Sequence, residues 1–339
     1  MEFNKSELEK CIKNLTKAKI LVVGDLALDE MVYGDTERIS REAPVLILRH
    51  SYTKYILGGA SNAAHNVSKI NDGKVSVIGI VGNDYHASDL IGEFNRANIN
   101  CEYLVTDDAR ETITKTRISG SCSQSVTQQI VRIDRQTSAP LSKETEEKLF
   151  LSLERAIPLH DLIILSDYHV GSLSQNVINK TIELANKHNK MIVVDAQRDL
   201  NNYKGITSLT PNLPDTQKYV GFYIKTDEDF IKAAQKLLKD TGASSVVITC
   251  GSDGMVVYNN DILTKIPVFR KSKVFDVTGA GDTVTAVYSL ALATGSTPEY
   301  AAFIGNMAAS IVIKQFGCAT TSVKELLDTL KYVQEECYV

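Results

Sequence analysis

The sequence lacks the features that mark membrane-spanning, secreted and nucleic-acid-binding proteins. No apolar run approaches the ~20 residues that a membrane span needs. No block of basic residues interleaved with aromatics occurs, and the formal net charge is −4, so we expect neither a membrane nor nucleic acid as a partner. The six cysteines form no Cys-x-x-Cys pair and the six histidines show no metal-ligand spacing. These absences, with a polar N-terminal segment unlike a signal peptide, indicate reduced thiols in a cytoplasmic protein.

Alternating strand and helix patterns run through the chain. Its 339 residues, of which 43% are hydrophobic, allow one large α/β domain or two ordinary ones. Continuous apolar runs predict buried parallel strands, and helical patterns lie between them. We expect the strands at residues 20–23, 75–80, 162–165, 191–194 and 246–249, and the helices at residues 60–70, 87–97, 175–188 and 227–239. This alternation predicts a doubly wound parallel sheet between two helical layers.

Two stretches depart from this alternation. Residues 31–56 and 101–135 are rich in Thr, Ile, Val, Tyr and Arg with alternating polarity, which is typical of exposed antiparallel strands. Strands inserted there could form a lid over the carboxyl ends of the parallel strands, where open sheets bind ligands. They could equally form an extension used for dimerisation, and the two roles are compatible.

The most informative segment is residues 276–284, which read DVTGAGDTV. Gly279 and Gly281 lead into Asp282, and an apolar run at 283–294 follows. This pattern predicts a flexible loop opening onto a buried helix, whose first N–H groups form an anion site. A carboxylate at that point suits removal of a proton from a hydroxyl that attacks a phosphate. Taken alone, the tetrapeptide fits a plain glycine turn at least as well.

Two early segments also carry glycines and polar residues that could bind a ligand. Asp25 and Asp29 come after the first predicted strand and could bind sugar hydroxyls or serve as a turn and helix cap. Gly58 and Gly59 precede Asn62, a pattern that admits a ligand to the backbone or simply allows close helix packing. The dinucleotide fingerprint Gly-x-Gly-x-x-Gly is absent.

Further polar groups come at the ends of later strands. They include the segments Ser166-Asp167-Tyr168, Asp195-Ala196-Gln197 and Thr210 to Asp215. On one sheet edge, such a row of Asp and Asn suits hydrated Mg²⁺ bound to nucleotide phosphates, although each segment alone also fits turn chemistry. Residues 249–254 fit either a nucleotide border or a plain hairpin.

Taken together, these motifs resemble the ribokinase-like, or PfkB, family of ATP-dependent sugar kinases over residues 20–321. Gly58-Gly59 with Asn62 is similar to one family signature, and residues 276–283 are similar to the other. Within the family, the chain looks most like the kinase domain of D-glycero-D-manno-heptose 7-phosphate kinases. The similar stretches include residues 38–45 (RISREAPV), 112–115 (TITK) and 128–134 (QQIVRID), of which the first and the last are distinctive of this branch.

The resemblance implies a three-layer α/β/α fold with a small β-sheet lid, a homodimer formed through the lid strands, and phosphorylation of the anomeric hydroxyl of heptose 7-phosphate for ADP-heptose synthesis. ATP, Mg²⁺ and K⁺ are the implied cofactors. Asp282 would be the base, assisted by the N–H groups of Gly279, Ala280 and Gly281. The sugar phosphate would lie against Asp25, Asp29, Gly58, Gly59, Asn62, Lys115, Arg117, Arg132 and Asp134. ATP would contact Asn212, Thr249, Gly251, Gly254, Gly281 and Asn306, with Mg²⁺ held through water by Asn212 and Asp215, and K⁺ by Asp276 and Thr278.

The chain departs from this branch at two expected lysines. Val170 stands where Asp-Tyr-x-Lys-Gly is expected, and Gln197 stands where Asp-Pro-Lys is expected. These changes keep two alternatives open, a kinase of another sugar phosphate and a catalytically weakened sugar- or nucleotide-binding regulator. Residues 119–127 are expected to lengthen a lid loop. Because no His-x-Gly-His motif occurs, we expect a single kinase domain over residues 1–339 without a nucleotidyltransferase.

Overall fold

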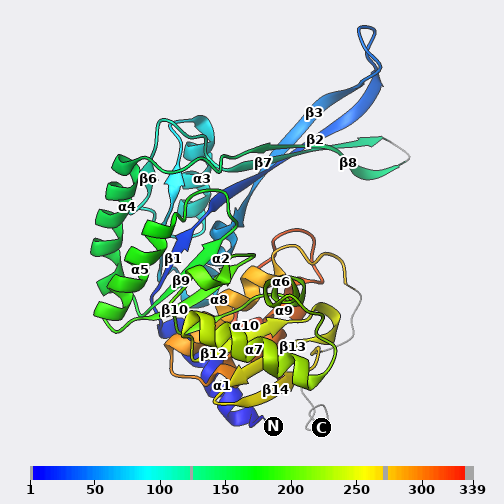
Figure 1. Cartoon of the computed structure of the whole chain (residues 1–339). Helices are drawn as coiled ribbons and strands as arrows, with labels where there is room; N and C mark the ends of the chain where they lie inside the picture. The colour runs from blue at the N-terminus through cyan, green and yellow to red at the C-terminus, as the bar shows by residue number, and fades with distance from the viewer. Residues whose placement is uncertain (1–2, 123–124, 270–273, 333–339) are drawn as a thin grey trace.

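The computed structural model describes residues 3–122, 125–269 and 274–332. An eight-stranded sheet lies at the centre of the molecule (Figure 1). The strand order is β14-β13-β12-β11-β10-β9-β1-β4. Strands from β4 to β12 are parallel, and β13 and β14 add an antiparallel edge. The bounds are β1 (Ile20–Gly24), β4 (Val75–Ile78), β9 (Leu162–Asp167), β10 (Met191–Ala196), β11 (Ser208–Leu209), β12 (Ser245–Thr249), β13 (Met255–Asn259) and β14 (Ile262–Ile266). The predicted parallel strands are confirmed, except that the run at 75–80 divides into β4 and a short strand at residues 80–81 outside this sheet.

Helices cover both faces of this sheet, because successive side chains of a strand point to opposite sides. In β1, Ile20 and Val22 join one hydrophobic core, whereas Leu21 and Val23 join the other. The first core includes residues of α2 (Ala60–Asn71), α8 (Ala280–Ala293) and α9 (Pro298–Val312), and the second includes residues of α4 (Lys143–Ala156), α5 (Gln175–Lys187) and α7 (Asp227–Thr241). The predicted three-layer α/β/α architecture is therefore confirmed.

Four further helices lie in the described ranges: α1 (Lys5–Asn14), α3 (Tyr85–Arg96), α6 (Leu213–Val220) and α10 (Val323–Leu330). Helix α1 packs against α10, so the two ends of the described chain meet on one side of the molecule. None of the helices in the described ranges has the length and apolar character needed to cross a bilayer.

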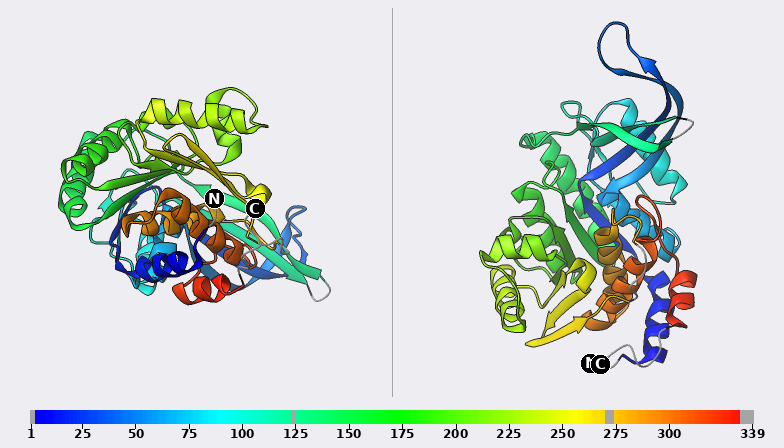
Figure 2. Two further views of the ribbon diagram at one scale, coloured as in Figure 1. Left: turned by 90° about the horizontal axis from the view of Figure 1, so that it is seen from below. Right: turned by 90° about the vertical axis from the view of Figure 1, so that its right-hand side faces the viewer.

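A second sheet, which we call the outlying sheet, projects from the α/β body (Figure 1, Figure 2). Its strand order is β3-β2-β7-β8, with bounds β2 (Leu26–Ile39), β3 (Leu46–Gly59), β7 (Thr114–Cys122) and β8 (Ser125–Arg135). The pairs β2–β3 and β7–β8 are antiparallel hairpins. The expected loop extension at 119–127 includes residues 123–124, which lie outside the described residues.

The structure corrects two details of the inserted strands. Strands β2 and β7 pair in parallel, not antiparallel, because both run outward from the body. Residues 101–113 do not belong to this sheet. Instead, β6 (Val105–Thr106) pairs with β5 (Ile80–Val81) in a separate two-stranded sheet.

The chain order of the main sheet reverses at β1, which lies between β4 and β9. In open α/β sheets, ligands bind outside the carboxyl ends of the strands at such a reversal. Gly24 at the end of β1 is paired with Ser166 near the end of β9. The residues that follow these two strands therefore meet where the topology predicts a site.

Candidate active site

Asp282 is the centre of the site and receives hydrogen bonds from two other elements. It lies in the first turn of α8 and is 5% exposed. Asn62 Nδ2 on α2 donates to Asp282 Oδ2 at 2.7 Å, and the Tyr168 hydroxyl after β9 donates to Oδ1 at 2.6 Å. Asn66 donates to Asn62 Oδ1 at 3.3 Å and accepts a bond from Thr283. This buried chain orients the Asn62 amide so that its nitrogen faces the carboxylate.

The surroundings of Asp282 place its ionisation close to neutral pH. Burial raises the pKa of the carboxyl to about 6, and the Asp29 carboxylate adds to this shift. The hydrogen bonds from Tyr168 and Asn62 and the charge of Lys115 oppose it, because each of them stabilises the ionised form. A carboxylate with a pKa near the working pH is suited to general-base catalysis.

The two glycines before Asp282 differ in what a side chain at each position would meet. Gly279 is the N-cap of α8 with φ 76°, and a Cβ there would lie 2.4 Å from Asn62 Nδ2, so a side chain is excluded by both conformation and space. At Gly281 a Cβ would meet no atom within 4 Å. The open space beside Gly281 therefore leaves room for a ligand to approach the backbone.

The N–H groups at the start of α8 correct one expectation. The Ala280 N–H donates to the Val277 carbonyl at 3.2 Å, so it is not available as an anion donor. Within the described part of the chain, the N–H groups of Gly279, Gly281 and Asp282 have no acceptor. Gly279 and Gly281 therefore stay available as predicted donors, and Asp282 is a further donor that we did not predict.

A cavity of about 150 Å³ opens beside Asp282 and is strongly acidic. No Lys or Arg is among its described lining residues, which are Asp167, Tyr168, Asp195, Ala196, Gln197, Asn212, Asp215, Gly279, Gly281 and Asp282. Burial raises the pKa of Asp195 to about 7, and the nearby carboxylates of Asp282 and Asp215 add to that shift. This acidic lining suits a cation held through water, although no group of three or more His, Cys, Asp or Glu in the described ranges is arranged to hold a metal ion directly.

A second cavity, of about 270 Å³, lies at the base of the outlying sheet. Its lining residues are Asp25, Ala27, Gly59, Ile113, Lys115, Arg132, Asp134, Gln136, Tyr168, Val170 and Gln197. Tyr168 and Gln197 line both cavities, so they lie between the two. Both follow predicted strand ends, a signal that could have identified them, whereas nothing in the sequence distinguished Gln136.

The three predicted cationic residues differ in how they are paired. Arg117 lies 2.9 Å from Asp29 Oδ1, and Arg132 contacts both oxygens of Asp134 at 2.8 and 2.9 Å. Lys115 forms no ion pair with any described residue, and its Nζ lies 5.8 Å from the centre of the Tyr168 ring.

Asp25 and Gly59 line this second cavity, whereas several other predicted sugar-site residues lie behind its wall. Asp25 is 1% exposed, and its carboxylate accepts hydrogen bonds from the backbone of residues 168–172. Asp29 is held by Arg117, and a Cβ at Gly58 would lie 3.1 Å from its carboxyl carbon. Neither Asp29, Gly58 nor Arg117 lines the cavity of about 270 Å³.

The predicted nucleotide residues occupy two neighbouring regions. Asn212 and Asp215 line the acidic cavity and hydrogen-bond each other at the start of α6. Thr249 forms an isolated bridge with Asn212. Gly251 and Gly254 lie in the β12–β13 connection, so the hairpin is confirmed there.

Asn306 is separate from the acidic cavity. Its side chain donates to the Pro267 carbonyl at 2.7 Å. Pro267, Leu213 and Cys250 border a larger cavity of about 780 Å³. Because Leu213 follows Asn212 directly, this cavity adjoins the acidic one along the chain, and its size lies in the usual range for small-molecule sites.

Asp276 forms hydrogen bonds that stabilise the loop containing it and Thr278. Asp276 Oδ1 accepts bonds from the Thr278 N–H and hydroxyl at 2.9 and 2.7 Å, and Oδ2 accepts from the Gly317 N–H at 3.0 Å. These bonds lower the pKa of Asp276, although burial acts in the opposite direction. A monovalent cation at these residues stays a prediction. Among the described residues no group of three or more His, Cys, Asp or Glu is arranged to hold a metal ion.

The fold and this site define a ribokinase-like α/β protein. A ribokinase of Arabidopsis thaliana solved with ribose and ATP superposes with a TM-score of 0.70 at 19% identity, covering 93% of this chain and 99% of that one. Phosphofructokinase-2 of Escherichia coli in complex with potassium gives 0.72 at 18% identity, with the same coverage. These likenesses confirm the expected fold.

Sequence comparison then assigns the family. The family model of pfkB family carbohydrate kinases matches residues 17–325, so the chain belongs to this family. It is 36% identical over 312 residues to the bifunctional protein HldE of Desulfatibacillum aliphaticivorans and 35% identical over 310 residues to that of Nitratiruptor sp.. The matches cover 92% and 91% of this chain, but only 63% and 64% of those relatives.

Proposed function

We propose that the protein transfers the γ-phosphate of ATP to the anomeric hydroxyl of D-glycero-D-manno-heptose 7-phosphate, giving heptose 1,7-bisphosphate for ADP-heptose synthesis in the cytoplasm. The observation that carries this proposal is the position of Asp282. It lines the acidic cavity and accepts a hydrogen bond from Tyr168. Tyr168 borders both the acidic cavity and the cavity of about 270 Å³ at the outlying sheet. The stretches at residues 38–45 and 128–134 support the choice of a heptose phosphate, and the HldE relatives support a sugar kinase.

In the proposed reaction, Asp282 removes the proton from the anomeric hydroxyl as that oxygen attacks the γ-phosphorus. A new phosphorus–oxygen bond forms to the sugar, and the bond to the oxygen of ADP breaks. The N–H groups of Gly281 and Asp282 stabilise the negative charge on the transferred group, as donors at a helix N-terminus do. The open space beside Gly281 admits the phosphate to these donors.

The acidic cavity fits hydrated Mg²⁺ bound to the nucleotide phosphates. Asp195, Asn212 and Asp215 would supply oxygen atoms of the kind that hold a hydrated Mg²⁺ ion. When bound, the ion would neutralise phosphate charge that the carboxylates otherwise repel. The cavity of about 780 Å³ beyond Leu213 is where we place the adenosine.

Lys115 is the best candidate to bind the phosphate that the sugar already carries. It lines the cavity of about 270 Å³ at the outlying sheet, which we call the sugar-side cavity. It has no ion pair among the described residues, whereas Arg117 and Arg132 are each paired with a carboxylate. Arg132 also lines this cavity and is 49% exposed, so it can exchange Asp134 for a phosphate when substrate arrives.

A kinase of another sugar phosphate is the second candidate. Val170 and Gln197 line the sugar-side cavity at the two positions where lysines were expected. The loss of two positive charges from this wall alters how a phosphorylated sugar is held, so the preferred sugar can differ from heptose 7-phosphate.

The test is turnover of ATP with Mg²⁺ and K⁺ against heptose 7-phosphate and a panel of pentose and hexose phosphates. We expect the highest kcat/KM for heptose 7-phosphate. A large preference for a hexose phosphate would replace the proposed substrate by the second candidate. Absence of turnover with all of them would contradict the proposal and favour a regulator.

A further inference from the structure

We infer that Tyr168 is a positioning residue for Asp282: its hydroxyl holds the carboxylate in place, and the loop of residues 168–172 that carries it is fixed by Asp25. This inference rests on the proposed role of Asp282 as the base. Tyr168 follows β9 at the reversal point of the main sheet, and it lies between the acidic cavity and the sugar-side cavity.

The hydroxyl of Tyr168 binds one Asp282 oxygen while Asn62 binds the other. With both oxygens held from different elements, the carboxylate has one orientation, and the lone pairs that remain on it are available to a substrate proton. Burial and the neighbouring carboxylates of Asp282 and Asp195 raise the pKa of Tyr168 well above its usual value. The phenol therefore stays protonated and donates throughout the working pH range.

Asp25 positions both residues that donate hydrogen bonds to Asp282, which are Tyr168 and Asn62. Its carboxylate accepts bonds from the N–H groups of Tyr168 at 2.9 Å, Val170 at 3.2 Å and Ser172 at 2.9 Å. Its carbonyl oxygen accepts the N–H of Ala60 at 3.0 Å, where the helix that carries Asn62 begins. One buried residue after β1 thus sets the position of the Tyr168 loop through its side chain and that of α2 through its backbone.

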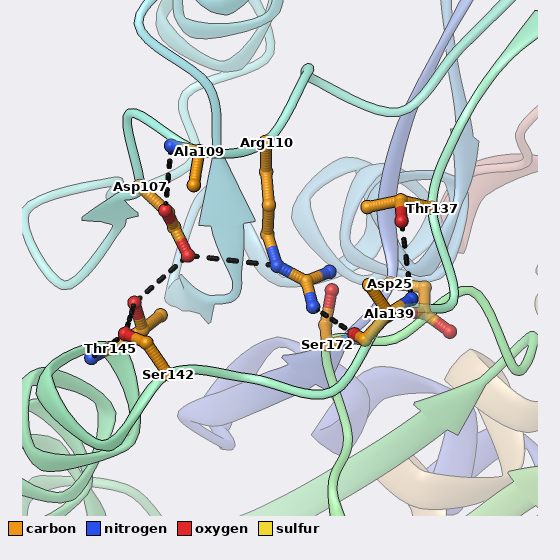
Figure 3. Close-up of polar contacts among 9 residues, drawn as sticks. All are labelled: Asp25, Asp107, Ala109, Arg110, Thr137, Ala139, Ser142, Thr145 and Ser172. Atoms are coloured by element: carbon orange, nitrogen blue, oxygen red, sulfur yellow. Dashed lines mark hydrogen bonds and ion pairs between the residues drawn. The ribbon is translucent and has the colours of Figure 1, made fainter.

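Arg110 supports the same loop from behind (Figure 3). Its side chain is 8% exposed, its Nε lies 3.6 Å from Asp107 Oδ2, and its Nη2 donates to the Ala139 carbonyl, with Asp25 and Ser172 close by. Gly171 has φ 92°, and a Cβ there would lie 3.0 Å from Arg110 Nη1 and 2.8 Å from the Thr137 carbonyl. The loop therefore packs closely on the segment that leads out of the outlying sheet and has little room to move.

Other charged groups also act on Asp282 and must be held constant in any test. Lys115 on β7 favours its ionised form, and Asp29 on β2 opposes it. Asp195 on β10 and Cys318 interact with Asp282 as well. Tyr168→Phe keeps the ring on which Lys115 lies, so it removes the hydroxyl while leaving these charges in place.

The experiment compares the pH dependence of kcat/KM for wild type, Tyr168→Phe and a matched control. Tyr288→Phe is the control, because Tyr288 is a fully buried tyrosine on the same helix as Asp282 whose hydroxyl bonds Ser208 and Ser245 instead. We expect Tyr168→Phe to move the acid limb of the profile upward by roughly one pH unit and to lower kcat more than it changes KM, since a bond to a charged group is lost. Tyr288→Phe should leave the limb in place.

A second measurement does not depend on turnover. The ¹³C resonance of the Asp282 carboxyl, assigned by its loss in Asp282→Asn, is titrated in protein labelled at the aspartate carboxyls. A higher midpoint in Tyr168→Phe than in wild type supports the inference even if no sugar phosphate is phosphorylated, in which case only the proposed function fails. An unchanged midpoint and an unchanged acid limb in folded Tyr168→Phe would overturn the inference.

Discussion

At Asp282, burial raises the pKa of the carboxyl group, whereas hydrogen bonding lowers it. Its pKa of about 6 means that the ionised base is present above this pH and is lost as the pH falls through it. We therefore expect kcat/KM to decrease below about pH 6. Asp282→Asn should lower kcat by ~10²–10⁴-fold, the usual contribution of a general base. Steady-state kinetics from pH 5 to pH 9 provide the measurement.

The stability of Asp282→Asn separates catalysis from folding. Because the folded-state pKa of Asp282 is raised above 3.8, ionisation of this group destabilises the folded protein once the pH exceeds that value. The asparagine variant should accordingly have a Tm at pH 8 no lower than that of wild type. Near-normal turnover in the variant would remove Asp282 from the mechanism.

Lys115 and Arg49 are both cations on the outlying sheet, but only Lys115 lines the sugar-side cavity. We expect Lys115→Met to raise KM for a sugar phosphate about tenfold or more, with a much smaller effect on KM for ATP, since a charge-assisted contact to phosphate is lost. Arg49→Met, which breaks exposed pairs with Asp35 and Glu37, should change neither. Equal increases of both KM values in Lys115→Met would instead indicate general damage to the site.

The start of helix α8 offers a matched pair of glycine substitutions. Gly279→Ala adds a Cβ at φ 76° that would collide with Asn62, so we expect it to lower the free energy of unfolding by at least about 1–2 kcal/mol and to disturb the bond to Asp282. Gly281→Ala meets no protein atom within 4 Å and should keep the wild-type Tm.

For Gly281→Ala we expect a loss of activity without a loss of stability. If the phosphate approaches the backbone at Gly281, a methyl group there should lower kcat and weaken ATP binding in a fully folded protein. Thermal unfolding and ATP titration of both variants provide the measurement. Full activity in Gly281→Ala would show that no ligand occupies that space.

Elements with a strong local pattern were predictable from the sequence, and their relative placement was not. The strand of residues 162–165 and the helix of residues 175–188 were recognisable because their apolar periodicity reflects direct burial. The parallel pairing of β2 with β7 depends on how two hairpins leave the body, which no local pattern encodes. Residues 101–113 were misassigned because their polarity resembles that of the true strands.

The same limit applies to the candidate site. Asp282 and Asn62 were identified from local motifs, and the structure brings them into contact. The tie between Asp25 and residues 168–172 spans more than 140 positions, so the sequence could not distinguish a sugar ligand from a loop anchor. Pairing of Arg117 with Asp29 likewise depends on strand register.

At the scale of the whole molecule, the outlying sheet has two unlike faces. Arg132 and Asp134 line the sugar-side cavity, and because side chains alternate along a strand, Val131 and Ile133 point to the opposite face. These two are 44% and 43% exposed. An exposed apolar surface on a projecting sheet is prone to association, so we propose that a second copy of the chain covers it in a homodimer.

This dimer makes a prediction about mass in solution. Light scattering coupled to gel filtration should give twice the 37.3 kDa of one chain at micromolar concentration. The double variant Val131→Glu and Ile133→Glu should give a single chain, because charges buried without partners oppose association. Leu151→Glu, at a residue of α4 that is 61% exposed and distant from the outlying sheet, should leave the mass of the wild type unchanged. A wild-type protein that elutes as one chain would contradict the dimer, whereas loss of the dimer in the control variant as well would place the interface elsewhere on the molecule.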